Sequence, residues 1–367
     1  MQTARDAGAG SVRICDAVAD AIVADRFDHA VERGDLATWP YDRAYAARAA
    51  APQALFGSAR AVVCIAVPYA APPPPVDRPL VGRVSNYAWS GDYHAVVRRI
   101  CERIVTVLDD AAPPARSRIV CDTAPLAERA FAARAGLGWI GKHTNVIAPN
   151  LGSYIFLGEV VTSAALPVDP PLRKECGSCT RCVDVCPTGA LRGDYTIDAT
   201  RCISDLTQRT DAIPRTLRPL MGTWVWGCDL CQAVCPPTRN AAIAPHPAFA
   251  NPASSAAFPD LVGLLELRSA EFKRRYRSTA MGWRGGAVLR RNAAVALGNT
   301  GDPLAVDPLE RALAADPHPL VRGHAAWALG RIGSPKALAA LRRAADMADR
   351  DPKVRAEIAA ALEPPPA

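Results

Sequence analysis

Eight of the chain's twelve cysteines lie between Cys176 and Cys235, at spacings that suit metal binding. They form two runs, CGSCTRCVDVCP and CDLCQAVCP, with Cys202 alone between them. Thiolates two residues apart can ligate one centre from a single short loop, and both runs close with C-x3-C-P. This stretch therefore predicts thiolate-bound metal centres, which the rest of the chain must position.

Iron–sulfur clusters explain this spacing better than zinc or disulfides do. The first run follows the C-x2-C-x2-C-x3-C-P pattern of bacterial two-cluster ferredoxins, in which the fourth cysteine ligates the other cluster. By that pattern one [4Fe–4S] cluster is held by Cys176, Cys179, Cys182 and Cys235, and the other by Cys186, Cys202, Cys228 and Cys231. Paired CxxC motifs also bind zinc, but zinc does not explain two C-x3-C-P endings. A long, apolar-rich chain has no need of disulfides.

The composition is that of an ordinary globular protein. The chain has 367 residues and half of them are apolar, which predicts two or three domains with complete cores. The best apolar run, residues 61–67, stops at Pro68 and is too short to span a membrane. Because the N-terminal segment carries neither a secretion signal nor a twin-arginine pair, we expect a cytoplasmic protein without a membrane span.

The N-terminal part of the chain predicts an α/β domain. Residues 11–31 place apolar side chains at roughly helical spacing, which indicates an amphipathic first helix. A second helix is expected over 95–108. Runs of β-branched and aromatic residues predict buried strands over 61–67, 119–121 and 154–161.

Asp122 lies at a position where a ligand is expected to bind. It follows the strand at 119–121 and precedes a helix expected over 125–135, and ligands of open α/β sheets bind at the carboxyl ends of strands. A second acid, Glu128, follows six residues later, and an N-cap or a surface ion pair is its simpler interpretation. The glycine-rich GLGWIG at 136–141 follows a helix rather than a strand, so it is not a dinucleotide-binding motif.

The C-terminal third predicts a repeat domain. Residues 236–259 are rich in proline and alanine and predict a linker. AAVALGNTGDP at 293–303 and AAWALGRIGSP at 325–335 match at a shift of 32 residues, and 354–362 begins a third copy. Helix pairs at such a period are typical of a HEAT-like α-solenoid, which presents a binding surface.

Basic residues concentrate where this repeat domain begins. Residues 268–291 contain eight lysines and arginines against one acid, Glu271, with three aromatic side chains between them. Arginines beside aromatics suit phosphate contacts and base stacking, although a solvated helix face is the alternative interpretation. The candidate nucleic-acid contacts are Arg284, Arg290, Arg291 and Arg322.

Several motifs occur in an order that is specific in combination. They are GRVSNYAWSGDYH (82–94), CDTAPLAERAFAARAGLGWIGKHTN (121–145), GSYIFLGE (152–159), the two cysteine runs, RCISDLTQ (201–208), GCDLCQAVCP (227–236) and RGHAAWALGRIG (322–333). In this order they resemble the cobalamin-dependent epoxyqueuosine reductases of tRNA modification, over nearly the whole chain.

The resemblance implies an oxidoreductase that reduces epoxyqueuosine to queuosine at the wobble position of tRNA. It implies a base-off cobalamin between the N-terminal and cluster domains, two [4Fe–4S] clusters, and Asp122 as the proton donor. By motif position the residues near cobalamin are Tyr45, Asp122, Lys142, His143, Asn145, Ser153, Ser204 and Asp229. Tyr45 departs from the family, because a rough alignment places an arginine there.

Together these patterns predict an α+β multidomain protein. Residues 1–165 are an N-terminal α/β cobalamin and substrate domain, 166–240 a ferredoxin-like two-cluster domain, and 241–367 a linker with a HEAT-like tRNA-binding domain. We expect a monomer that receives electrons from an external low-potential donor. One alternative is a reductive dehalogenase-like enzyme, which the missing twin-arginine leader disfavours. Another is an iron–sulfur electron-transfer protein with a partner-binding solenoid, which leaves Asp122 without a role.

Overall fold

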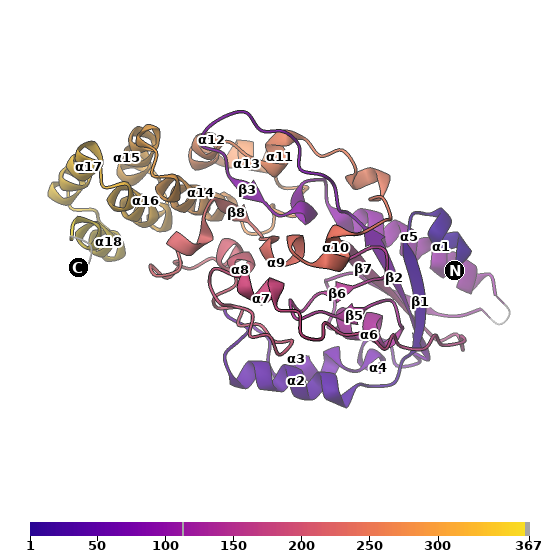
Figure 1. Cartoon of the computed structure of the whole chain (residues 1–367). Coiled ribbons are helices and arrows are strands. Elements are labelled where there is room, and N and C mark those ends of the chain that lie inside the picture. The colour runs from indigo at the N-terminus through magenta and orange to yellow at the C-terminus, as the bar shows by residue number, and fades with distance from the viewer. Residues whose placement is uncertain (112–113, 364–367) are drawn as a thin grey trace. The chain divides into compact units, whose positions relative to one another are not determined.

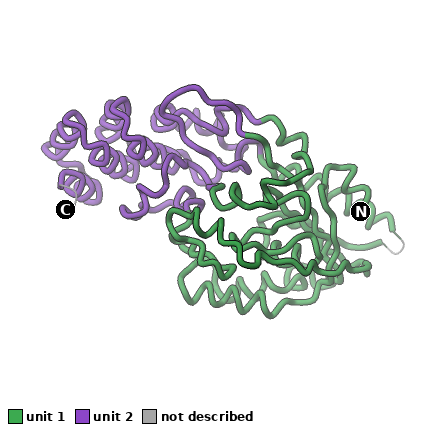
Figure 2. Tube along the Cα trace, viewed as in Figure 1, with its two compact units in different colours: residues 1–72, 92–202, 229–251 green, residues 73–91, 203–228, 252–367 purple. Residues whose placement is uncertain are grey.

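The computed structural model describes residues 1–111 and 114–363, which form two compact units. Unit 1 comprises residues 1–72, 92–202 and 229–251, and unit 2 comprises 73–91, 203–228 and the chain from 252 onward (Figure 2). Each unit draws on all three predicted domains, 1–165, 166–240 and 241–367. The division into a cobalamin and substrate domain, a cluster domain and a tRNA-binding domain therefore remains a prediction about what each segment does.

Unit 1 is built on a four-stranded sheet with the strand order β1-β2-β7-β4, of which β1, β2 and β7 are labelled in Figure 1. Its strands are β1 (Ser11–Asp16), β2 (Ala61–Pro68), β7 (Ile155–Thr162) and β4 (Ser117–Val120). All of its pairings are antiparallel. The two central strands β2 and β7 are almost wholly buried, as their runs of valine, isoleucine and leucine predict.

Helices pack against the sheet. Helix α5 (Tyr93–Asp109) approaches β7 at Gly158, where an added Cβ would lie 2.4 Å from Val97. Helix α6 (Glu128–Arg134) contributes Phe131 to the hydrophobic core that contains Cys15 and Cys64. The predicted strands and the helix expected over 95–108 are confirmed as β2, β4, β7 and α5.

Two element predictions in unit 1 need correction. Residues 11–16 form strand β1 instead of the start of a helix, because Val12 and its neighbours pair with β2. Helix α2 (Ala21–Glu32) begins only after its N-cap Asp20. The helix expected over 125–135 starts three residues later, at Glu128. In both places long-range pairing or packing outweighs local periodicity.

The remaining elements of unit 1 are short. They are α1 (Gln2–Asp6), α3 (Arg43–Ala49), α4 (Pro52–Leu55), the paired strands β5 (Trp139–Ile140) and β6 (Val146–Ile147), α7 (Arg181–Asp184), α9 (Leu230–Ala233), α10 (Pro236–Arg239) and η3 (Pro247–Phe249). Helices α7 and α9 each lie inside one of the cysteine runs.

Unit 2 is mainly helical. Strand β3 (Arg83–Val84) pairs in parallel with β8 (Trp224–Trp226). Its first helices are η1 (Asn86–Ala88), α8 (Ile203–Gln208), η2 (Pro219–Met221), α11 (Ser254–Ala257), α12 (Leu261–Leu265) and α13 (Ser269–Arg275). The repeat region follows with α14 (Gly286–Thr300), η4 (Pro303–Ala305), α15 (Val306–Ala315), α16 (Pro319–Ile332), α17 (Pro335–Asp346) and α18 (Pro352–Leu362).

The predicted 32-residue repeat has a packing reason. A Cβ added at Gly298 would lie 2.8 Å from the Cα of Ala328, where α14 meets α16. A Cβ added at Gly330 would lie equally close, 2.8 Å, to Ala361, where α16 meets α18. Glycine therefore recurs at the equivalent repeat position because consecutive inner helices touch there. This confirms the HEAT-like solenoid.

None of the helices in the described ranges has the length and apolar content needed to cross a membrane.

Candidate active site and cofactor-binding residues

Asp122 lies just beyond β4 and is held by two hydrogen bonds. Its φ of 57° is in the left-handed region, which aspartate adopts more readily than most residues. Its side chain is exposed, and its Oδ2 accepts a hydrogen bond of 2.7 Å from the hydroxyl of Tyr93. Its main-chain N–H donates to Oε1 of Glu128 at 2.6 Å. The carboxyl is thus fixed in place while remaining open to a substrate.

Tyr93 is itself held rigidly at the first position of α5. Its ring stacks on Phe156 of β7, with ring centroids 4.2 Å apart and planes inclined by 1°. The stacking fixes the direction from which the hydroxyl reaches Asp122. Sequence reasoning did not single out Tyr93, although the residue lies within the GRVSNYAWSGDYH motif.

Two glutamates, Glu128 and Glu159, lie close to Asp122. Glu159 on β7 is fully buried, beside Cys64 of β2 and Val120 of β4. Burial raises the pKa of Glu159 well above its usual range, and the nearby Glu128 adds to the effect. Burial also raises the pKa of Glu128, to about 7. The interpretation of Glu128 as an N-cap or a surface ion pair is therefore wrong, because its carboxyl faces inward and binds the Asp122 amide.

Tyr45 is brought close to Asp122. It lies half-buried on α3 and stacks on Tyr41, with centroids 4.3 Å apart. Burial, followed by Tyr41, raises the pKa of Tyr45 to about 12, and the charges of Glu128 and Asp122 contribute. The phenol therefore stays protonated at neutral pH and can only donate or accept a neutral hydrogen bond.

The loop at 139–145 contains the clearest signs of a polar ligand site. His143 is buried, its Nδ1 accepts from the Asn145 N–H at 3.2 Å, and burial lowers its pKa to about 4. The imidazole is therefore neutral. Within the described residues His143 Nε2 and Trp139 Nε1 are buried without hydrogen-bond partners. Buried polar atoms rarely lack a partner, so these two fit a ligand rich in amides, such as a corrin.

The other predicted cofactor contacts are distributed as follows. Lys142 Nζ donates at 2.8 Å to the carbonyl of Gly177, next to Cys176. The buried Ser153 is linked to Thr238, with 2.9 Å between the two hydroxyl oxygens. In unit 2, Ser204 Oγ accepts from its helix neighbour Gln208 at 3.2 Å. In unit 1, Asp229 is buried at the N-cap of α9.

Thiols from both cysteine runs gather in unit 1. Burial raises the pKa of Cys182, and the charges of Cys176, Cys235 and Cys179 raise it further. The pKa of Cys235 is likewise raised by burial and by Cys176 and Cys179. No three His, Cys, Asp or Glu side chains of the described part come close enough to hold one metal ion. A four-iron cube spreads its thiolates more widely, because each binds a different iron.

The arginines selected for tRNA binding are mostly engaged within unit 2. Arg291 is fully buried and donates to the carbonyls of Leu206, Arg209 and Asp211 at 2.8 Å. Burial lowers its pKa to about 9. The prediction that Arg291 contacts tRNA is wrong, because its guanidinium is buried and binds carbonyls at the end of α8 and just after it.

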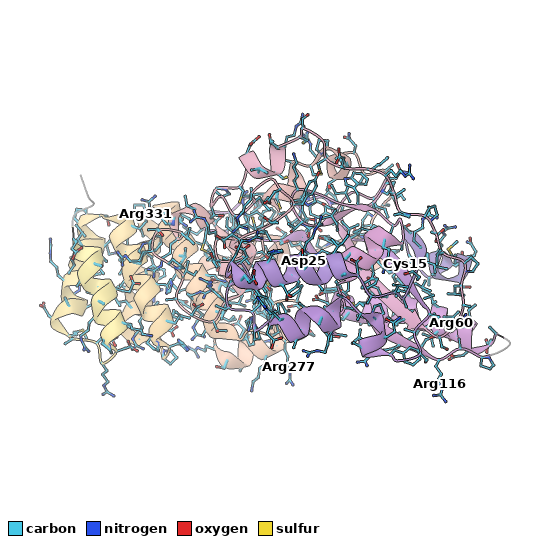
Figure 3. The ribbon with its side chains drawn as sticks, turned by 90° about the horizontal axis from the view of Figure 1, so that it is seen from below. Cys15, Asp25, Arg60, Arg116, Arg277 and Arg331 are labelled. Atoms are coloured by element: carbon cyan, nitrogen blue, oxygen red, sulfur yellow. The ribbon has the colours of Figure 1, made fainter. Side chains whose placement is uncertain are left out.

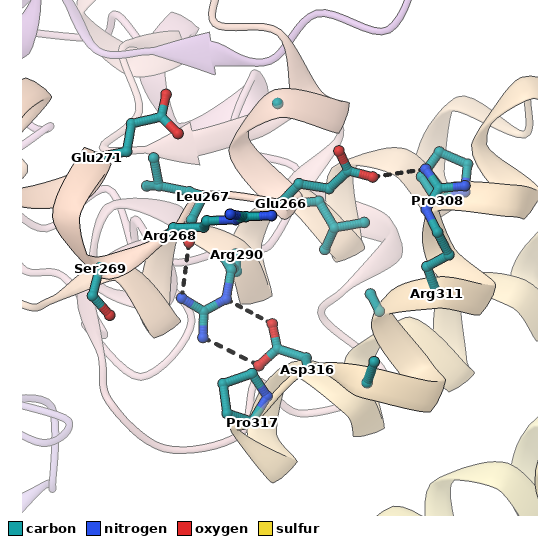
Figure 4. A pocket seen from close by; sticks show the side chains of 14 residues that line it. Glu266, Leu267, Arg268, Ser269, Glu271, Arg290, Pro308, Arg311, Asp316 and Pro317 are labelled. Atoms are coloured by element: carbon teal, nitrogen blue, oxygen red, sulfur yellow. Dashed lines mark hydrogen bonds and ion pairs between the residues drawn. The ribbon is translucent and has the colours of Figure 1, made fainter.

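Arg290 and Arg322 are paired with acids. Arg290 binds Asp316 at 2.7 and 3.1 Å in a pocket between α12, α14 and α15 (Figure 4). Arg322 binds Asp349 at 2.6 and 2.9 Å. Arg284 lies over the ring of the exposed Trp283, 3.7 Å from its centroid. Exposed charge instead lies on and around α13, at Arg268, Lys273, Arg274, Arg275 and Arg277, the last labelled in Figure 3.

Unit 1, with its cysteine runs and its positioned carboxyl, and unit 2, with its helical repeats, define the class: a redox enzyme with a HEAT-type module. Three family models match this chain. They are described as "4Fe-4S double cluster binding domain" over residues 175–238, "HEAT repeats" over 287–363, and "Epoxyqueuosine reductase QueG, DUF1730" over 49–123. The segment 175–238 is accordingly a domain for two [4Fe–4S] clusters.

Relatives with curated names narrow the class further. An epoxyqueuosine reductase of Bacillus anthracis is 36% identical over 278 residues, covering 74% of this chain and 72% of that protein. The Escherichia coli K12 epoxyqueuosine reductase is 40% identical over 222 residues, covering 60% and 58%. A crystal structure of epoxyqueuosine reductase with an epoxyqueuosine-modified tRNA-Tyr stem loop matches with a TM-score of 0.90 and 32% identity, over 98% of this chain and 96% of that one.

A Bacillus subtilis epoxyqueuosine reductase, with its catalytic aspartate loop swung out of the active site, matches equally well. Its TM-score is 0.90 and its identity 31%, with the same coverage of 98% and 96%. This chain belongs to the epoxyqueuosine reductase family. It is therefore an oxidoreductase.

Proposed function

We propose that this protein reduces the epoxide of epoxyqueuosine in tRNA to the alkene of queuosine. The observation that carries the proposal is Asp122, exposed yet fixed by Tyr93 and Glu128, in the same unit as seven of the eight predicted cluster cysteines. Cytoplasmic location, a monomeric state and an external low-potential electron donor belong to the same proposal.

The reaction balances with residues of this chain in defined roles. Converting an epoxide to an alkene breaks two C–O bonds, consumes two electrons and two protons, and releases the oxygen as water. The cluster cysteines hold the centres that pass the electrons. Asp122 delivers one proton to the departing oxygen, solvent supplies the second proton that completes the water, and Tyr93 orients the Asp122 carboxyl. An exposed acid can be protonated again by solvent between turnovers.

Cobalamin is proposed as the third cofactor, and it would supply the reduced metal that transfers electrons to the substrate carbon. His143 and Trp139 fit corrin amides through their buried, unpartnered nitrogens. Tyr45, Lys142, Asn145, Ser153, Ser204 and Asp229 remain proposed contacts. Tyr45 offers a neutral phenol where the family's arginine was expected, so its contact would lack a positive charge.

The proposed function is tested directly with protein purified without oxygen. We expect about eight irons and one cobalamin per chain. Incubated with a chemical reductant and tRNA that carries epoxyqueuosine, the protein should yield queuosine, which nucleoside mass analysis detects as loss of one oxygen atom. Iron without cobalamin would favour the electron-transfer alternative. A cobalamin-loaded protein that leaves the epoxide unchanged would overturn the proposed substrate.

We further propose that tRNA binds the exposed basic residues of α13 and the segment after it. Replacing Lys273, Arg274 and Arg277 by alanine should weaken tRNA binding and leave cluster content unchanged. Each interaction with a phosphate that the substitutions remove should lower the log–log salt slope of binding by about 0.7 to 0.9. The measurement is the tRNA dissociation constant at several salt concentrations, and an unchanged slope would assign these residues to a solvated face.

Arg291→Met is the matched control for this experiment. Removing the guanidinium leaves the buried carbonyls of Leu206 and Arg209 without this donor, at a cost of about 1–3 kcal/mol each, and also frees the partly buried carbonyl of Asp211. We therefore expect a large fall in melting temperature. The salt slope of the protein that remains folded should not change.

A further inference from the structure

Glu159 is an acid in a site that does not accept a negative charge. It is 0% exposed, and within the described residues neither of its carboxyl oxygens accepts a hydrogen bond. Burying a carboxylate without a donor costs far more than keeping its proton. Glu159 is therefore neutral in the folded protein.

The Glu128 carboxylate lies beside Glu159 and can accept the proton of Glu159 in a hydrogen bond. The two side chains are hydrogen-bond neighbours, and two carboxyl groups can bond only if one of them carries a proton. Glu128 thus accepts from Glu159 on one side and, at 2.6 Å, from the Asp122 N–H on the other. The chain Glu159–Glu128–Asp122 runs from the sheet interior to the exposed carboxyl.

Few charges oppose this arrangement. The titratable or charged groups that face the pair come from every surrounding element: Arg129 on α6, Asp122 after β4, Tyr45 on α3, Cys15 on β1, Cys64 on β2, Cys101 on α5 and Cys121 after β4. Arg129 is the one cation among them. It is exposed, and it donates to the Thr144 carbonyl at 3.2 Å.

We propose that Glu128 and Glu159 are positioning residues for Asp122. Neutral Glu159 orients the Glu128 carboxylate, and Glu128 holds the Asp122 main-chain N–H so that the left-handed conformation at φ 57° persists. The inference rests on the proposed function only in that Asp122 is taken as the proton donor.

The arrangement has a pH dependence of defined sign. Because burial raises the pKa of Glu128 to about 7, Glu128 becomes protonated as the pH falls through that value. Its bond to the Asp122 N–H then loses the strength that a charged acceptor provides. The Asp122 turn is therefore held most firmly above pH 7 and loosens below it.

The first test uses Glu128→Gln and Glu128→Ala, with Glu102→Gln as a control that removes an exposed glutamate of α5. We expect kcat to fall by up to about 10²-fold in Glu128→Ala and less in Glu128→Gln, whose amide oxygen can still accept the N–H. The tRNA KM and cofactor content should not change, and the limb of the kcat–pH profile near pH 7 should disappear in both variants. Amide exchange at Asp122 should accelerate in Glu128→Ala. Wild-type exchange or an intact pH limb would overturn the proposal.

The second test isolates the neutral partner. Burial raises the pKa of Glu159 in the folded protein. Above about pH 4.3 the unfolded chain therefore gives up a proton that the folded protein keeps. The free energy of unfolding then falls as the pH rises from about 4.3 toward the pKa of the folded state. In Glu159→Gln the side-chain amide donates the hydrogen bond to Glu128, and because it does not titrate it causes no such loss of stability. The melting temperature of this variant should match the wild type near about pH 5 and exceed it increasingly toward pH 8. A difference that does not vary with pH would show that Glu159 is not the neutral donor.

These thermal and exchange measurements require no substrate. Failure of the positioning proposal is thus distinguishable from failure of the proposed reaction, which the tRNA product analysis tests alone.

Discussion

Asp122→Asn is expected to lower turnover by about 10²- to 10⁴-fold, the usual contribution of a general acid. Asparagine tolerates the positive φ, accepts the hydrogen bond of the Tyr93 hydroxyl and keeps the main-chain bond to Glu128. What it lacks is an acidic proton that it can give to the departing oxygen. The loss should therefore appear in kcat, measured as queuosine formed per enzyme in the presence of excess tRNA.

The same variant should load cobalamin and both clusters, reduce them and bind tRNA as the wild type does. Tyr93→Phe is the matched partner, because it removes only the hydroxyl that orients the acid, and it should cost less than Asp122→Asn. An active asparagine variant beside an inactive Glu128→Gln would transfer the acid role to Glu128. Loss of cobalamin from Asp122→Asn would make Asp122 a cofactor anchor.

The metal chemistry was predictable because it depends on local spacing. Cysteines at fixed short intervals must act together wherever the chain carries them, so the two runs predicted two clusters before any fold was known. The position of Asp122 after a strand was predicted correctly, but the rule used to connect that position with ligand binding does not apply to this sheet. The rule for carboxyl ends of strands concerns open α/β sheets with parallel strands, and the sheet of unit 1 is antiparallel.

Residues whose role depends on distant partners were beyond the sequence patterns. Arg291 stands in a basic run, and charge alone places it at the surface. It is buried because carbonyls more than seventy positions earlier, at Leu206, Arg209 and Asp211, need its donors. Linear charge density carries no information about such partners.

Glu159, by contrast, stands out in the sequence. It is the one Asp, Glu, Lys or Arg between Lys142 and Asp169, and it stands within a predicted buried strand. An acid in that setting must be neutralised or paired, which is a reason to search for a second acid nearby. Tyr93 is harder to find, because its role depends on where α5 begins relative to the end of β4.

Cys235→Ala should remove the cluster of the first cysteine run, although Cys235 belongs to the second. Its thiol lies near those of three cysteines of the first run. The charges of Cys176 and Cys179 raise the pKa of Cys235, and the charge of Cys235 raises the pKa of Cys182. Losing one of four thiolates should empty that site, leaving about four of eight irons. Iron analysis and the electron paramagnetic resonance of the reduced protein measure the loss.

The reciprocal variant tests the crossed ligand pattern. Cys186→Ala, in the first run, should remove the other cluster, for which Cys186, Cys202, Cys228 and Cys231 are the predicted ligands. The spectrum of Cys235→Ala should then match that of Cys179→Ala, and the spectrum of Cys186→Ala should match that of Cys231→Ala. Cys101→Ala, a buried cysteine of α5 outside both runs, should retain all iron. If Cys235→Ala instead matched Cys231→Ala, each run would hold its own cluster, and the ferredoxin-type exchange of ligands would not apply to this chain.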